Sequence, residues 1–132
     1  MAALGPCRTI LVADDDYDVQ VIAHAYFCSH GHTVLSAYDG RECLDIARAH
    51  APDIIVLDVR LPDMDGVQVA HRLKADPTTC ATPILAVSGI VNMRRPMLEA
   101  GCEDFILKPV LPGDLLDMIE LILADRERRQ GT

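Results

Sequence analysis

The sequence is poor in aromatic residues and in positive charge. Its 132 residues include two Phe, three Tyr and no Trp, although half of the residues are hydrophobic. We therefore expect a core of aliphatic side chains. Lys and Arg number 12 against 20 Asp and Glu, which gives a formal net charge of −8. This balance disfavours nucleic-acid binding by the chain, because binding to the phosphate backbone needs a basic face.

Long apolar runs are also missing. No run approaches the roughly 20 apolar residues that cross a membrane, and the first nine residues, MAALGPCRT, lack the apolar stretch of a signal peptide. We therefore expect no membrane association and a cytoplasmic location.

Cysteines and histidines show no metal-binding spacing. No CxxC pair and no Cys/His cluster with zinc spacing occurs, so we interpret the five cysteines as reduced structural thiols, three of them (Cys28, Cys43 and Cys102) within or beside apolar helical patterns. The five histidines are expected to be exposed; they are His24, His30, His32, His50 and His71.

Short apolar runs alternate with helical patterns. The runs at 9–13, 33–37, 54–57, 83–87 and 105–107 predict buried strands. The stretches between them predict helices, the first with an apolar face of Val19, Ile22, Ala23 and Tyr26. The others are expected at 41–50, 66–75, 92–100 and from 113 to about 124. Pro96 means that the fourth helix either starts late or is kinked.

This alternation predicts an α/β fold with a doubly wound parallel sheet. We expect one flavodoxin-like (βα)5 domain over residues 9–124, with strand order 2-1-3-4-5. Residues 1–8 would form an N-terminal extension, and residues 125–132 a polar, solvated tail.

The predicted order brings charged strand ends together. Asp14 and Asp15 would lie beside Asp58, with Ser88 and Lys108 on the same rim. Two carboxylates about 4 Å apart repel by roughly 4 kcal/mol at an effective dielectric constant of 20. Mg²⁺ would relieve this repulsion, because it prefers oxygen ligands. Asp58 as nucleophile, with Mg²⁺, Lys108 and Ser88 holding phosphoryl oxygens, would make a phosphoryl-accepting pocket.

Each acid also has a simpler interpretation. Asp14, Asp15 and Asp16 can cap the first helix, and Asp16 is the stronger candidate for a cap. Asp63 and Asp65 are expected to cap the third helix, and no chemistry is assigned to them. Asp58 taken alone could be a turn residue, Ser88 a loop residue and Phe105 ordinary core.

Four motifs together resemble the receiver domain of two-component response regulators. They are LVADD (11–15), VLDVRLPDMDG (56–66), Ser88 and FILKP (105–109), in the order of that family and spread over residues 9–123. The resemblance implies that Asp58 is the phosphoacceptor and Lys108 the phosphoryl-binding lysine. It also implies an Mg²⁺ or Mn²⁺ site made by Asp15 and Asp58, with Asp14 in support and the Arg60 backbone carbonyl as a further ligand.

The same resemblance implies a switch. Ser88 would turn toward the phosphoryl group, Phe105 would swing inward, and the Lys108–Pro109 bond would be cis. The donor would be a histidine kinase or a histidine phosphotransfer protein, and the readout a downstream effector protein or domain. The chain departs from the family pattern at Gly89, at Pro96 and in the 20 positions between Ser88 and Lys108.

Three function classes remain after these observations. The first is a signalling phosphoacceptor, with weak self-phosphorylation and self-dephosphorylation but no conventional enzyme turnover. The second is a non-switching interaction module on the same fold. The third, a magnesium-dependent phosphatase, is disfavoured, because such enzymes usually carry a second acid where this chain has Arg60.

Overall fold

Strands and helices alternate through residues 6–130, the part of the chain that the computed structural model describes. All ten expected elements are present, so the (βα)5 prediction is confirmed. The strands are β1 (Thr9–Ala13), β2 (Thr33–Ala37), β3 (Ile54–Asp58), β4 (Ile84–Ser88) and β5 (Asp104–Leu107). The helices are α1 (Tyr17–Ser29), α2 (Gly40–His50), α3 (Gly66–Ala75), α4 (Arg94–Glu99) and α5 (Pro112–Gln130).

The five strands form one parallel sheet in the predicted order, β2-β1-β3-β4-β5. Ala13 of β1 pairs with Leu57 of β3, so the next residues, Asp14 and Asp58, emerge side by side. The register of β4 against β5 pairs Ser88 with Leu107. Lys108 therefore emerges at the same edge of the sheet as the acids.

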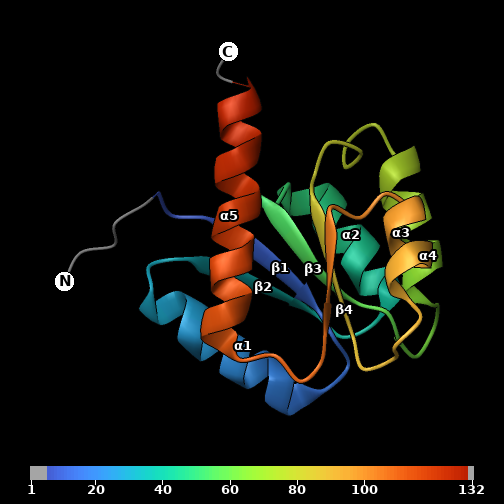
Figure 1. The fold of residues 1–132 in the computed structure, drawn as a ribbon, viewed down its shortest axis with the longest axis horizontal. Helices are drawn as coiled ribbons and strands as arrows, with labels where there is room; N and C mark the ends of the chain where they lie inside the picture. The colour runs from blue at the N-terminus through green and yellow to red at the C-terminus, as the bar shows by residue number, and fades with distance from the viewer. Residues whose placement is uncertain (1–5, 131–132) are drawn as a thin grey trace.

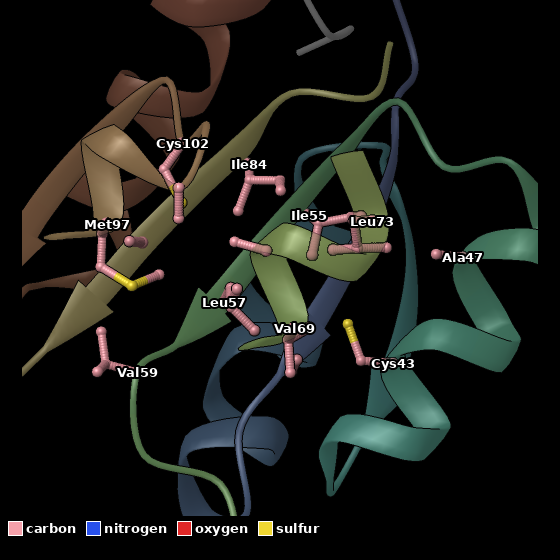
Figure 2. Packing of buried hydrophobic residues seen from close by; sticks show 14 of the residues in the cluster. Cys43, Ala47, Ile55, Leu57, Val59, Val69, Leu73, Ile84, Met97 and Cys102 are labelled. Carbon is pink, nitrogen blue, oxygen red and sulfur yellow. The ribbon is translucent and has the colours of Figure 1, made fainter. Parts of the chain in front are cut away.

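Helices cover both faces of the sheet, with α1 and α5 on one face and α2, α3 and α4 on the other (Figure 1). Alternate residues of each central strand supply the two cores, because successive side chains point to opposite faces. On the second face, Leu57 and Ile55 of β3 meet Val69 and Leu73 of α3, with Met97 of α4 at one side (Figure 2). The core is aliphatic, as expected.

The buried face of α1 agrees with the expected one at Ala23 but not at Ile22. Ile22 is 55% exposed, whereas the buried residues are Gln20, Ala23 and Phe27. The sequence pattern was misleading because a glutamine occupies an inward position. Its amide nitrogen lies within hydrogen-bond distance of the Val12, Asp14 and Ala37 carbonyls, and these contacts offset part of the cost of its burial, while its Oε1 has no partner among the described residues.

Pro96 is accommodated by a late helix start. Helix α4 begins at Arg94, so Pro96 is its third residue and lies in the first turn. Backbone N–H groups of a first turn have no partner within the helix, and a proline there removes no hydrogen bond. Of the two alternatives, the late start is correct.

Helix α5 is longer than the sequence predicted. It continues to Gln130, past Ala124, where the apolar pattern ends. Its last turns are held by ion pairs rather than by apolar burial: Arg126 binds Glu103 and the Ala81 carbonyl, and Glu127 binds Arg8. Residues 125–130 are polar and mostly exposed, as expected, but they are helical, while 131–132 and residues 1–5 of the expected extension lie outside the described residues.

One further expectation about a single residue is wrong. His32 is buried rather than exposed: its Nδ1 accepts the Arg8 backbone N–H, and its Nε2 lies 3.4 Å from Glu120. Of the three cysteines within or beside apolar helical patterns, Cys28 is exposed, which that pattern did not indicate, whereas Cys43 and Cys102 are buried. Burial raises the pKa of both buried thiols to about 12, which keeps them protonated and unreactive. Within residues 6–130, none of the helices is both long and apolar enough to span a membrane.

Candidate functional site

Three carboxylates converge where β1 and β3 end. Carboxylate oxygens of Asp14, Asp15 and Asp58 lie within 4.8 Å of one another. Asp14 and Asp58 are only 4% and 8% exposed, whereas Asp15 is exposed. The structure therefore brings together the three acids that the sequence assigned to one site.

Lys108 completes the cluster from the end of β5. Its Nζ lies 2.9 Å from Asp58 Oδ2 and 3.0 Å from Asp14 Oδ2 and donates a hydrogen bond to each. One ammonium group thus bridges two nearly buried acids. Such pairing is needed because an unpaired buried carboxylate is strongly disfavoured.

The pKa values of the pair reflect this environment. Burial raises the pKa of Asp58, and hydrogen bonds from the Arg60 amide and from Lys108 offset only part of that effect. Burial alone would lower the pKa of Lys108, but its hydrogen bonds to Asp58 and Asp14 reverse the direction and raise it. Lys108 is therefore a permanent positive charge in this site at neutral pH.

Each buried acid also accepts one backbone hydrogen bond. The Asp16 amide donates to Asp14 Oδ1 at 2.9 Å, and the Arg60 amide donates to Asp58 Oδ1 at 3.0 Å. These bonds fix the carboxylates while leaving oxygen lone pairs free. Asp16 thus contacts Asp14 through its backbone amide, while its own carboxylate caps α1 as expected.

The donor set fits a small divalent cation. Carboxylate oxygens are hard ligands, and Mg²⁺ takes one or two of them together with waters and phosphate oxygens. Two of the three acids have partners, and the third, Asp15, is open to solvent. Asp15 and Asp58 can therefore contribute oxygens to a cation without any rearrangement of the fold.

Ser88 lies on the same rim but is differently engaged. It is fully buried at the end of β4, and its Oγ accepts the Ile90 amide at 2.9 Å. Its carbonyl accepts the Lys108 amide at 2.7 Å, which links it to the lysine through the backbone. Within the described contacts, the Ser88 hydroxyl turns toward its own loop and not toward the acids.

Phe105 is buried in the core shared with α2, α3 and α4. Arg94 of α4 donates to the Phe105 carbonyl and to the Asp104 carboxylate, each at 3.2 Å. These bonds tie the start of α4 to β5. The peptide bond between Lys108 and Pro109 is cis, as the resemblance implied.

Sequence reasoning missed Gln20. Its Nε2 lies within 3.0 Å of the Val12, Asp14 and Ala37 carbonyls, so it ties the β1 end that carries Asp14 to β2. A glutamine three residues before Ala23 and seven before Phe27, all on one helix face, was the available signal. Its polarity concealed its inward position.

Asp63 has a different role from the one expected. Asp65 caps α3 in a capping box, as predicted. Asp63, however, accepts the Gly40 and Arg41 amides and so caps α2. The prediction failed because this contact joins the loop after β3 to the first residues of α2, more than 20 residues away in the sequence.

An apolar cavity adjoins the site. It lies between the sheet, α1 and α5, has a volume of about 440 Å³, and reaches Asp58 and Lys108 at one end. Ala23 is among its lining residues and is the smallest side chain that α1 presents there. The space is therefore open partly because Ala23 is small.

Fold and site together define a class of protein. It is a flavodoxin-like α/β domain with a cluster of three acids and a lysine at the carboxyl ends of its strands, where doubly wound sheets place their ligands.

Comparisons with known proteins identify the family. The family model for the response regulator receiver domain matches residues 10–120. The chain therefore belongs to the receiver domain family of two-component signalling. It is 35% identical over 123 residues to the transcriptional regulatory protein PrrA of Mycobacterium tuberculosis, covering 93% of this chain and 51% of PrrA. The chain thus spans about half the length of that relative.

Solved structures show the same fold. A CheY-like response regulator receiver domain protein from Methanospirillum hungatei has a TM-score of 0.86 at 25% identity, covering 94% of this chain and 99% of that one. The receiver domain of the sensor histidine kinase PA1611 from Pseudomonas aeruginosa has a TM-score of 0.81 at 26% identity, covering 90% and 99%. That structure has a magnesium ion coordinated in its active-site cleft.

Proposed function

We propose that this chain is a phosphoacceptor that takes a phosphoryl group onto Asp58 and switches conformation to control a partner protein. The observation that carries the proposal is the bridge from Lys108 to Asp58 and Asp14, beside a third carboxylate. A nucleophilic acid, a cation site and a fixed ammonium group are the parts that phosphoryl transfer needs.

In the proposed reaction an oxygen of Asp58 attacks the phosphorus of a phosphohistidine. The new P–O bond forms as the P–N bond breaks, and the electron pair of that bond stays on the imidazole nitrogen, which takes up a proton. Lys108 moves from pairing with the carboxylate to pairing with a phosphoryl oxygen, so its charge is used in both states. Asp15 and Asp58, with the Arg60 carbonyl and with Asp14 in support, would hold Mg²⁺, which would supply positive charge to the phosphoryl oxygens.

The proposed switch begins at Ser88. A phosphoryl group on Asp58 offers strong acceptor oxygens, and the Ser88 hydroxyl would exchange its bond with the Ile90 amide for one of them. The loop after β4 would then move, and with it α4 and the Arg94 bonds to β5. Phe105 already lies in the core, so its part would be to hold β5 against α4 as that loop moves.

The partners follow from the same chemistry. A histidine kinase or a histidine phosphotransfer protein would supply the phosphoryl group in the cytoplasm, and a downstream effector protein or domain would read the switched surface. Self-phosphorylation from small donors and self-dephosphorylation would be slow. The competing candidate is a non-switching interaction module. The paired, preorganised Lys108 favours the phosphoacceptor over it, because a static module has no use for a cation site with a bridging lysine.

The proposal is tested by intact-mass spectrometry after incubation with a phosphohistidine-bearing phosphotransfer protein, or with acetyl phosphate, in the presence of Mg²⁺. We expect one added phosphoryl group, and none when Mg²⁺ is omitted from the incubation. If neither donor produced an adduct at any time after mixing, the static module would be the better description.

A further inference from the structure

The loop between β3 and α3, residues 59–65, is joined to the phosphoacceptor site at its base. The Arg60 amide donates to Asp58 Oδ1 at 3.0 Å. The base is closed by an antiparallel backbone β-bridge between Arg60 and Asp65. A short hydrogen bond from the Gly66 amide to the Val59 carbonyl closes it further. A Cβ on Gly66 would lie 2.7 Å from Val59 Cα, so this closure needs glycine. Arg60 thus belongs to a tightly closed loop.

The tip of the same loop is fixed to α2. Asp63 Oδ1 accepts the Gly40 amide at 2.7 Å, and Oδ2 accepts the Arg41 amide at 2.9 Å. These bonds, with the Gly40 amide first, lower the pKa of Asp63, so its carboxylate is charged at neutral pH. The neighbouring Met64 packs against Gly40. A Cβ added to Gly40 would lie only 2.3 Å from the Met64 Cγ.

Helix α2 therefore has two capping carboxylates of different origin. Asp39, the residue just before the helix, accepts the Glu42 amide at 2.8 Å. Asp63, from a loop more than 20 residues away in sequence, accepts the Gly40 and Arg41 amides. Of these two caps, only Asp63 connects the helix to the loop that contacts Asp58. A helix needs caps for its own stability, but it does not need one of them to come from this loop.

We propose that Asp63 is a positioning residue for the metal site: by accepting the first amides of α2, it holds the loop so that Arg60 stays in place beside Asp58. This inference rests on the proposed function, in which Arg60 contributes a backbone carbonyl to Mg²⁺. Groups that orient metal ligands without touching the metal commonly alter its affinity strongly when removed.

The test compares Asp63→Ala with Asp39→Ala, since both remove a cap of α2 and only the first releases the loop. Mg²⁺ binding is measured by titration calorimetry on the whole chain, and amide hydrogen exchange of residues 59–66 is followed without metal. We expect Asp63→Ala to weaken Mg²⁺ binding roughly tenfold and to speed exchange of the Arg60 amide. Asp39→Ala should lower the melting temperature but change Mg²⁺ affinity by less than about twofold.

A kinetic comparison separates positioning from catalysis. In phosphorylation by acetyl phosphate, Asp63→Ala should need more Mg²⁺ for half-maximal rate yet reach the wild-type rate at saturation. Asp63→Asn keeps one acceptor oxygen, so the Mg²⁺ concentration that it needs for half-maximal rate should lie between those of the wild type and Asp63→Ala. It also gives a second variant if the alanine protein folds poorly. Equal Mg²⁺ affinity in wild type, Asp63→Ala and Asp39→Ala would overturn the inference alone. Absence of Mg²⁺ binding by the wild type would overturn the proposed function and the inference with it.

Discussion

The Lys108 ammonium lies 2.9 Å from the Asp58 carboxylate, although 50 residues separate the two in sequence. Each stands at the end of its strand, and β3 and β5 both pair with β4, so the sheet register brings them together. The lysine also reaches Asp14, which makes it the common partner of two nearly buried acids. Loss of this one side chain leaves both acids without their cation.

Lys108→Met keeps the length of the side chain but removes its charge. We expect the free energy of unfolding at neutral pH to fall by about 1–2 kcal/mol, less than for a fully buried pair because the lysine is 31% exposed. The raised pKa of Lys108 means that this contribution is complete at neutral pH and is lost only as the pH rises through the folded value. Phosphorylation by acetyl phosphate should slow roughly 100-fold.

Lys74→Met is the matched control. Lys74 donates to the Cys80 and Thr82 carbonyls, away from the acids. Its replacement should also reduce stability in urea titrations but leave the phosphorylation rate unchanged. If the two variants slowed phosphorylation equally, the assigned role of Lys108 would be wrong.

Asp58→Asn is expected to stabilise the metal-free protein. Burial raises the pKa of Asp58 in the folded chain, so ionisation costs the folded state free energy at neutral pH. This cost is complete above the folded pKa and vanishes below the unfolded value. Asp58→Asn should therefore gain about 1 kcal/mol at pH 7, on the usual scale of single substitutions, and the gain should disappear near about pH 3.

Mg²⁺ should reverse the order of these two proteins. At about 100 times its dissociation constant, a ligand adds about 2.7 kcal/mol to the stability of the protein that binds it. Thermal melts with and without Mg²⁺ should show this gain for the wild type and little of it for Asp58→Asn. Equal stabilisation of both proteins would place the metal elsewhere.

The cavity under α1 predicts a stabilising substitution. Ala23 is 5% exposed and lines this space, so Ala23→Leu should fill part of it and raise the free energy of unfolding by about 1 kcal/mol. Ala47 is equally small and 1% exposed, but it lies in the packed core of the other face. Ala47→Leu should instead cost about 1–3 kcal/mol. Urea titrations of the pair measure the difference in sign.

Gly89, one of the departures from the family pattern, has open space around it. A Cβ there would meet nothing within 4 Å, and its backbone is outside the left-handed region. Gly89→Ala should therefore stabilise the chain by about 0.4–1 kcal/mol by restricting the unfolded state. Gly66→Ala, where the Cβ would meet Val59, should destabilise it strongly. A loss of stability in Gly89→Ala would show that this loop needs a conformation closed to alanine.

Prediction from the sequence succeeded where a local pattern decides the structure. The apolar runs that begin at Thr9 and Ile54 predicted the strands. Because these strands run parallel, the acids that follow them were correctly predicted to lie on one rim of the sheet. It failed where a contact between distant segments decides. Nothing near Asp63 indicates that its partner is Gly40, and nothing near Arg126 indicates that Glu103 would extend α5. Gln20 was missed for a third reason, because its polarity concealed an inward position from which its amide nitrogen reaches three backbone carbonyls.

The phosphoacceptor itself is tested most directly by borohydride trapping. Borohydride reduces an aspartyl phosphate to homoserine, which survives digestion and can be located by peptide mass spectrometry. After incubation with a phosphoryl donor and Mg²⁺, we predict homoserine at position 58, and none when Mg²⁺ is omitted. Homoserine at another aspartate, or none in a sample whose intact mass shows the added phosphoryl group, would contradict the assignment of Asp58.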